Sequence, residues 1–148
     1  MATTTPSAAH HTEVANRLRP ALLKLARELR RESHALGVRA GHVTLLIQIH
    51  RHQGIGVTEL AALERISAPA MSGYIARLER AGLVQRTPDP RDRRRQGLSV
   101  TVEGERVLRS VKSRRTAWLA ARLKRLDPDE VAALDAAVEP LLRLLEDE

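Results

Sequence analysis

The chain has 148 residues, which is enough for one well-buried core and too few for two domains of ordinary size. Its 25 lysines and arginines exceed its 18 aspartates and glutamates, and the net charge of +7 favours a polyanionic partner, either nucleic acid or an acidic membrane surface. Cysteine is absent, which excludes disulfides, thiolate metal sites and cysteine nucleophiles, and no apolar run approaches the roughly 20 residues that span a bilayer.

The N-terminal arm, residues 1–12, is expected to be disordered because its small residues and histidines show no periodicity. It also lacks the basic and apolar parts of a secretion signal, so a cytoplasmic location is expected. From Glu13 onward a spacing of three and four predicts an amphipathic helix whose apolar face carries Val14, Leu18, Leu22, Leu25 and Leu29. Pro20 lies inside this pattern and predicts a kink or a break, because an interior proline removes one backbone hydrogen bond.

A second, mostly apolar helix is predicted from about His42 to His52, between the glycine-containing segments "ALGVRAG" and "QGIG". Two short helical patterns follow, with a tight junction at residues 65–67. The first, "VTELAALERI", has Thr58 as its expected N-cap. The second, "SAPAMSGYIARLERAGL", begins at the expected N-cap Ser67 and has Pro69 in its first turn, where the missing N–H is harmless.

The helix after Ser67 has two different faces. Met71, Ile75 and Leu78 are spaced at i, i+4 and i+7 and form the stripe expected to be buried, which leaves a small and polar outer face. Gly82 is the expected C-terminal stop, and "LVQRT" and "GLSVT" follow as the two short strands of a hairpin. Five arginines lie between residues 86 and 95, so the tip of this hairpin is strongly basic.

The last third of the chain is helical again. Thr101 is the expected cap of a long helix, and the string "DPDE" at residues 127–130 supplies an Asp cap, a proline and a glutamate for the start of another. This last helix carries a heptad-like apolar stripe at Val131, Leu134, Val138, Leu141 and Leu145. Because such a stripe suits packing against another helix, residues 13–36 and 102–148 are predicted to form a dimerisation layer.

Residues 40–101 have the order helix, tight turn, helix, strand, basic loop, strand, which is that of a winged helix-turn-helix. The predicted fold class is mostly α with a small β-hairpin, in one domain over residues 13–148 that combines this DNA-binding lobe with the dimerisation layer. A helix in the major groove needs small side chains near its start, so that its backbone can approach the bases. From this recognition helix we expect DNA contacts by Ser67, Pro69, Ala70, Ser72, Gly73 and Arg77.

The basic hairpin would form the wing beside the recognition helix. Its tip would follow the adjacent minor groove, where the negative potential favours an inserted arginine while neighbouring arginines contact phosphates. The predicted DNA-binding wing residues are Arg86, Arg91, Asp92, Arg93, Arg94 and Arg95. Double-stranded DNA is therefore the predicted partner.

The segment 57–105 resembles the core motif of the MarR-type transcriptional regulators, notably in "RLERAGLVQR", "DPRDRR" and "LSVTVEG". The resemblance implies a homodimer built from the N- and C-terminal helices and bound to a palindromic operator. It also implies release by a small aromatic or phenolic ligand in the crevice between dimer layer and DNA-binding lobe, and an Asp92 that orients Arg94, the minor-groove arginine. The chain departs from the family pattern at Pro20 and at Gly97, where a bulkier residue is expected.

Three other classes of protein fit the sequence less well. An enzyme would need a nucleophile with a base, a carboxylate pair in an apolar cleft or a phosphate loop, and the sequence shows none of these arrangements. An RNA-binding protein would expose aromatic residues for stacking, whereas aromatic residues make up 1% of this chain. A membrane-surface helix would combine Lys and Arg with Trp or Phe, but here the basic cluster lies in a proline-containing loop. A DNA-binding transcriptional regulator is predicted, with repression expected and activation as the alternative.

Two groups of polar residues suggest chemistry that we do not expect. Asp89 and Asp92 could be a catalytic or metal-binding pair, but among five arginines they are better explained as internal salt-bridge partners that stiffen the loop. His42, His50 and His52 are spaced at i, i+8 and i+10, not at the i, i+4 spacing that chelates a metal from one helix. No metal and no cofactor are therefore predicted.

Overall fold

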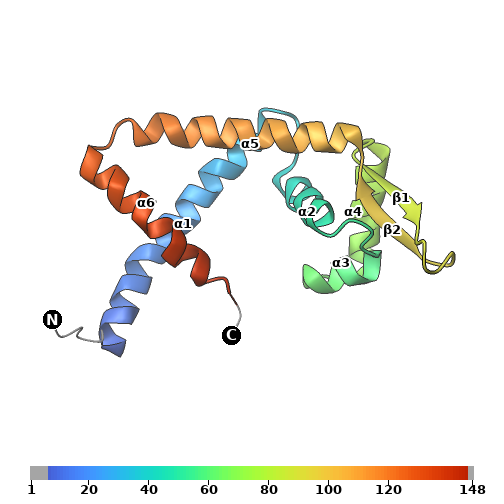
Figure 1. Ribbon diagram of the computed structural model, residues 1–148, viewed down its shortest axis with the longest axis horizontal. Helices are drawn as coiled ribbons and strands as arrows, with labels where there is room; N and C mark the ends of the chain where they lie inside the picture. Colours follow the sequence, from blue (N-terminus) through green and yellow to red (C-terminus); the bar gives the residue numbers. More distant parts are fainter. Residues whose placement is uncertain (1–6, 147–148) are drawn as a thin grey trace.

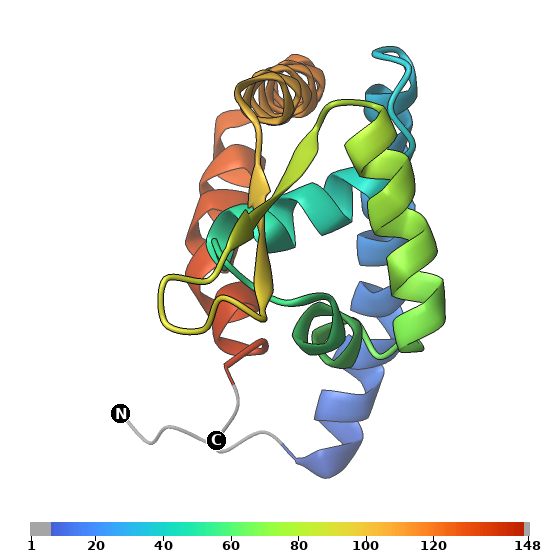
Figure 2. The same cartoon turned by 90° about the vertical axis from the view of Figure 1, so that its right-hand side faces the viewer.

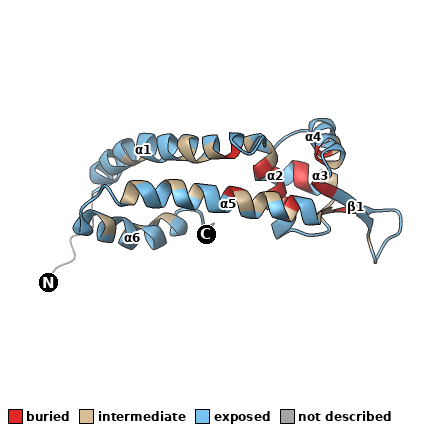
Figure 3. Ribbon diagram, turned by 90° about the horizontal axis from the view of Figure 1, so that it is seen from above, coloured by how far each residue is buried: buried red, intermediate tan, exposed pale blue. Residues whose placement is uncertain are grey.

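The computed structural model describes residues 7–146, which form six helices and one antiparallel hairpin (Figure 1). The elements in chain order are α1 (Ala8–His34), α2 (Ala40–Arg51), α3 (Val57–Leu63), α4 (Ala68–Arg80), β1 (Val84–Pro88), β2 (Gln96–Val100), α5 (Val102–Leu123) and α6 (Pro128–Arg143). In Figure 1, α5 runs along the top and joins a lobe made of α2, α3, α4 and the hairpin to two outer helices, α1 and α6, which overlap in this view but lie apart in Figures 2 and 3. The predicted fold class is confirmed.

Helix α1 begins earlier than the sequence pattern predicts. Ser7 is its N-cap, and the Ser7 hydroxyl accepts a hydrogen bond from the His10 amide at 3.3 Å. The expected disordered arm is therefore wrong for residues 8–12, because this cap starts a helix before the apolar spacing begins. The rest of that arm, residues 1–6, lies outside the described residues. Pro20 is exposed and does not break α1, since water can reach the carbonyl that loses its helical partner.

The hydrophobic core lies in the lobe and not in the outer helices α1 and α6 (Figure 3). Met71, Ile75 and Leu78 of α4 are fully buried, as their spacing predicted, against apolar side chains of α2, α3 and β2. By contrast, α6 has no buried residue, and Ser33 is the one buried residue of α1. The lobe can therefore fold around its own core, whereas the apolar faces of α1 and α6 remain uncovered in a single chain.

Several helix ends follow the predicted capping residues. The side chains of Ser67, Thr101 and Asp127 each accept a hydrogen bond from a first-turn amide of α4, α5 and α6. Gly82 has a positive φ of 74° and ends α4, with its own amide bonded to the Glu79 carbonyl and the next amide to the Leu78 carbonyl. These caps are local, which is why the sequence predicts them.

The predicted cap of α3 is wrong. The helix begins at Val57 with Gly56 as N-cap, and Thr58 lies inside its first turn. The reason is a tertiary contact: the Gly54 amide donates to the Leu98 carbonyl and the Leu98 amide donates to the Ile55 carbonyl, each at 2.8 Å. This bridge holds the chain extended up to residue 55, so the helix starts directly after it.

The same bridge explains why residue 97 is a glycine. A Cβ atom at Gly97 would lie 2.5 Å from the Gly54 carbonyl oxygen and 2.8 Å from the Gly54 Cα, both of which are backbone atoms that cannot move aside. The departure from the family pattern at this position is therefore a consequence of the close approach of the Gly54 backbone to β2.

Replacing Gly97 by valine is expected to lower the free energy of unfolding by about 1–3 kcal/mol, because the added side chain forces β2 away from Gly54. Chemical denaturation followed by circular dichroism measures this loss. Gly41→Ala is the matched control, since a Cβ at Gly41 has no neighbour within 4 Å and α2 tolerates alanine. Equal stability of the Gly97→Val protein and wild type would contradict this account of β2.

Arginine side chains of α5 bind the last turns of α1. The Arg115 guanidinium donates to the Leu29 carbonyl at 3.1 Å and to the buried Ser33 hydroxyl at 2.8 Å, and Arg114 bonds both the carbonyl and the carboxylate of Glu32. Burial and the nearby charge of Arg30 lower the pKa of Arg115. These contacts fix α1 against α5 and so connect α1 to the helix that leads into the lobe.

Candidate nucleic-acid interface

The outer face of α4 consists of small and polar side chains. All six residues predicted on this helix are exposed, namely Ser67, Pro69, Ala70, Ser72, Gly73 and Arg77. A Cβ at Gly73 would have no neighbour within 4 Å, so the surface around it is open. Arg77 lies about one turn after Tyr74, and its guanidinium is over the Tyr74 ring, 5.8 Å from the ring centroid. The small side chains on the outer face of α4 therefore allow a polyanion to approach the helix backbone closely.

The hairpin stands beside α4 and is tied to it by an ion pair (Figure 2). Arg86 of β1 donates from Nε to the Glu79 carboxylate of α4 at 2.9 Å, and both side chains are about one-third exposed. Arg86 therefore differs from the other predicted wing arginines, since its charge is already matched within the protein. Its position suits holding the hairpin at a fixed angle to α4.

The tip of the hairpin is organised by its two aspartates. The Asp89 carboxylate accepts the Arg91 amide at 2.8 Å, and the Asp92 carboxylate accepts the Arg94 amide at 3.0 Å. The prediction that these aspartates form internal salt bridges is wrong, because in residues 7–146 no ion pair involves either of them. A short Asp side chain reaches the amide two residues ahead more easily than it reaches the guanidinium group of a neighbouring arginine. The hydrogen bond to that amide closes a turn of the backbone.

This arrangement leaves the tip arginines available. Arg91, Arg93, Arg94 and Arg95 are exposed, and within the described part of the chain none of them forms an ion pair. The contact between Asp92 and Arg94 joins carboxylate to backbone, so Asp92 acts on the turn from which the Arg94 side chain projects. The tip is therefore a hydrogen-bonded turn that presents unmatched positive charge.

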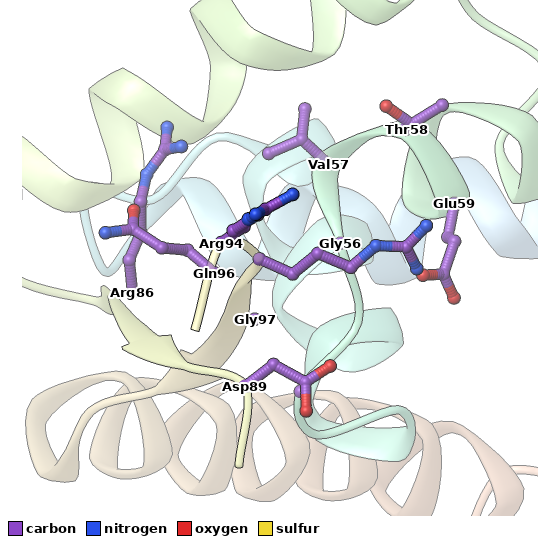
Figure 4. A pocket seen from close by; sticks show the side chains of 11 residues that line it. Gly56, Val57, Thr58, Glu59, Arg86, Asp89, Arg94, Gln96 and Gly97 are labelled. Carbon is purple, nitrogen blue, oxygen red and sulfur yellow. The ribbon is translucent and has the colours of Figure 1, made fainter. Parts of the chain in front are cut away.

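A cavity of about 550 Å³ separates the hairpin from the start of α3 (Figure 4). Arg86, Arg94 and Arg95 line it from the hairpin, and Thr58 and Glu59 line it from α3. Figure 4 shows the Arg94 side chain extending from the hairpin toward Val57. No sequence pattern indicates that α3 joins this surface, because the contact depends on the bridge between residues 55 and 98.

Comparison with known proteins agrees with this geometry. The model of the MarR family matches residues 39–95, and an HTH-type transcriptional regulator of Mycobacterium bovis is 30% identical over 134 residues, 90% of this chain and 94% of the relative. The chain belongs to the MarR family. A crystal structure of a transcriptional regulator protein from Pseudomonas aeruginosa, 34% identical, covers 97% of this MarR-family chain and 100% of its own with a TM-score of 0.84. A mutant of MepR from S. aureus, bound to an oligodeoxyribonucleotide, shares the fold at 18% identity and a TM-score of 0.68, over 90% of this chain and 98% of its own.

MarR-family proteins are transcription regulators and not enzymes, so the prediction of a regulator is confirmed. None of the helices in residues 7–146 is long and apolar enough to cross a membrane. In this MarR-family chain the three histidines considered as metal ligands have separate surroundings. His50 bonds to the Glu105 carboxylate of α5 at 2.8 Å, His42 lines a cavity beside α4, and His52 is the exposed residue that ends α2.

Proposed function

We propose that this MarR-family regulator is a homodimer that binds a palindromic operator, represses transcription and is released by a small aromatic or phenolic ligand. The observation that carries the proposal is the exposed, unpaired arginine turn beside the small-residue face of α4. Two such surfaces, related by the two-fold axis of a dimer, would match the two halves of a palindrome.

The assignment of roles follows from the two surfaces. We assign the outer face of α4, from Ser67 to Gly73, to the base edges of the major groove, and Arg77 to a phosphate. Arg94 is assigned to the minor groove, with Arg91, Arg93 and Arg95 on phosphates. Arg86 would act through Glu79 on the angle of the wing. Because the proposed DNA target lies in the cytoplasm, the protein would act there.

The uncovered helices support the dimer. Leu134, Val138 and Leu142 of α6 are each about half exposed, and Leu22 and Leu25 of α1 are 40% and 45% exposed. Apolar rows of this length are uncommon on the surface of monomers, so a second copy is expected to cover them. Residues 13–36 and 102–146 would supply this layer, and the last two residues of the predicted segment lie outside the described part.

A cavity between α2 and α5 suits the proposed ligand. It has a volume of about 620 Å³, an apolar floor that includes the buried Val43 and Val111, and a basic rim that includes Arg51, Arg109 and Lys112. An aromatic ring would fit the floor and an acidic group would face the rim. Because the cavity lies between the lobe and α5, a ligand there could change the angle between them. Repression needs only that the bound dimer exclude RNA polymerase from the promoter.

The proposal is tested by footprinting the purified protein on the DNA upstream of its own gene, with and without phenolic compounds such as salicylate. The expected result is a protected, two-fold symmetric segment that is lost when an active ligand is added, together with lower transcription from that promoter in vitro. Binding without sequence preference would contradict the operator, and transcription that rises with bound protein would contradict repression.

Gly73→Gln is expected to weaken specific binding by about 1–3 kcal/mol or to change the preferred site, because the longer side chain stands between α4 and the bases. The fold should be unaffected, since the space around Gly73 is open. Selection of binding sites from random DNA, compared with the thermal melting of the same variant, measures both effects. An unchanged site and affinity in both Gly73→Gln and Ser72→Leu would remove α4 from the interface.

A further inference from the structure

A second basic surface lies on the other side of α4 from the hairpin. It is a cavity of about 320 Å³ between the start of α2, the junction before α4 and α4 itself. Arg39 and His42 line it from α2, Glu64 and Ile66 from the junction, and Tyr74 and Arg77 from α4, and no residue of the hairpin contributes. In Figure 2 the hairpin lies to the left of α4, whereas α2 begins behind α4 on the right.

The charges around this cavity are unbalanced. Arg39 and Arg77 face a single carboxylate, Glu64, and in residues 7–146 none of these three side chains forms an ion pair. The first turn of α2 has no side-chain cap, so its amides add partial positive charge at the same place. Arg77 lies over the Tyr74 ring, which restricts where the guanidinium can point. The cavity therefore combines an excess of positive charge with fixed donors, as an anion site requires.

The pKa of His42 responds to this excess of positive charge. Partial burial lowers its pKa from the ordinary value of 6.5, and the charges of Arg39 and then Arg77 lower it further. Besides the two arginines, the titratable groups that line the cavity with His42 are Glu64 and Tyr74, and among the described residues α1 contributes none to the lining. In the free protein the imidazole is consequently neutral near neutral pH, and an anion placed between it and the two arginines would favour its protonated form.

A helix in the major groove has a phosphate backbone on each side, because the groove is about 12 Å wide and the helix with its side chains nearly fills it. The wing is assigned to one of these backbones. Arg77 is four residues after Gly73 and so lies on the same side of α4, next to the bases that Gly73 is proposed to approach. The cavity that Arg77 lines then faces the backbone that the wing does not reach.

We propose that Arg39, His42 and Arg77 together bind a DNA backbone phosphate on the side of the recognition helix opposite to the wing. This inference rests on the proposed operator binding and names a phosphate site that neither the wing nor the base-facing residues of α4 supply. Because the bound phosphate favours the imidazolium form, binding takes up a proton at His42. Operator affinity should therefore rise as the pH falls through the range in which His42 titrates in the complex.

The test uses the full-length protein and a duplex that wild type selects from a random-sequence pool. Wild-type affinity is expected to rise severalfold from about pH 7.5 to about pH 5.5, and His42→Gln to remove most of this rise. Arg39→Ala should lower the slope of log affinity against log salt concentration by about one unit, the effect of one lost phosphate contact. His52→Gln, a change of an exposed histidine at the other end of α2, is the control and should behave as wild type.

Titration of the His42 imidazole by NMR gives an independent readout. Its pKa is expected to rise when the selected duplex is bound, and to rise much less with inorganic phosphate at the same concentration. Wild-type pH dependence in His42→Gln, or an unchanged His42 pKa in the bound protein, would overturn the inference while leaving operator binding intact. An equal response to inorganic phosphate would show a site for free anions and would overturn it as well. A protein that selects no duplex would overturn the proposed function first.

Discussion

Operator affinity should fall by about 100- to 10,000-fold when Leu134 and Val138 are both replaced by glutamate. The two side chains lie on one face of α6 and are 51% and 48% exposed in the single chain, where the proposed partner would cover them. Glutamates there would have to be buried without a partner charge, so the dimer should dissociate. A monomer holds one half-site only and loses the gain in effective concentration that links the second half-site to the first.

Light scattering measures the assembly directly. Wild type should have twice the chain mass of 16.4 kDa and the double variant a single chain mass at micromolar concentration. The control is the double variant Ala132→Glu/Ala136→Glu, because these exposed residues lie on the opposite face of the same helix and gain the same two negative charges. A monomeric wild type, or a Leu134→Glu/Val138→Glu variant that remains dimeric and binds normally, would contradict the proposed assembly.

The second large effect is expected at the wing. Arg94→Ala should cost about 1–3 kcal/mol of specific binding, because it removes the arginine proposed to enter the minor groove. Arg91→Ala, Arg93→Ala and Arg95→Ala should instead weaken binding to all sequences and each lower the salt slope by about one unit. Affinities for the selected operator and for unrelated DNA across a salt series separate these two classes. If all four substitutions changed binding alike, the minor-groove role of Arg94 would be lost.

Asp92 can be tested by two substitutions that separate its charge from its hydrogen bond. Asp92→Ala removes the acceptor of the Arg94 amide and should weaken operator binding in the same direction as Arg94→Ala, but by less. Asp92→Asn keeps an acceptor oxygen and loses the charge, so it should bind at least as well as wild type. Tighter binding by both variants at every salt concentration would mean that Asp92 only repels phosphate and does not hold the turn.

The sequence predicted those parts of the fold that local chemistry decides. The caps of α4, α5 and α6 each need one side chain and one nearby amide, and all three were predicted. The caps that failed depend on what sequence patterns do not contain. Thr58 does not cap α3 because Ile55 pairs with β2 and the helix begins directly after that pair. The start of α1 lies before the first apolar residue of its stripe, so periodicity could not locate this helix start.

The candidate interface could be predicted in part for the same reason. The small face of α4 and the basic hairpin are continuous in sequence, so their composition indicates a DNA-binding surface. The pairing of Arg86 with Glu79 and the cavity that joins Arg39 to Arg77 depend on the folded arrangement of separate segments. The sequence shows which residues carry positive or negative charge, but it does not show which of these charges are already paired within the protein.

Helix α5 runs without interruption from the hairpin to the region of α1 and α6, so it can act as a lever. The hydroxyl of its N-cap, Thr101, donates to the Gly82 carbonyl in the connection between α4 and β1, and Arg115 holds α5 to α1 further along. Twenty-two residues at about 1.5 Å each make a rod of about 33 Å, so a tilt of about 5° about one end moves the other by about 3 Å. A displacement of that size is as large as a hydrogen-bond length. In the proposed dimer on DNA, a slight rotation at the far end of α5 would therefore be enough to take the wing out of register with a groove.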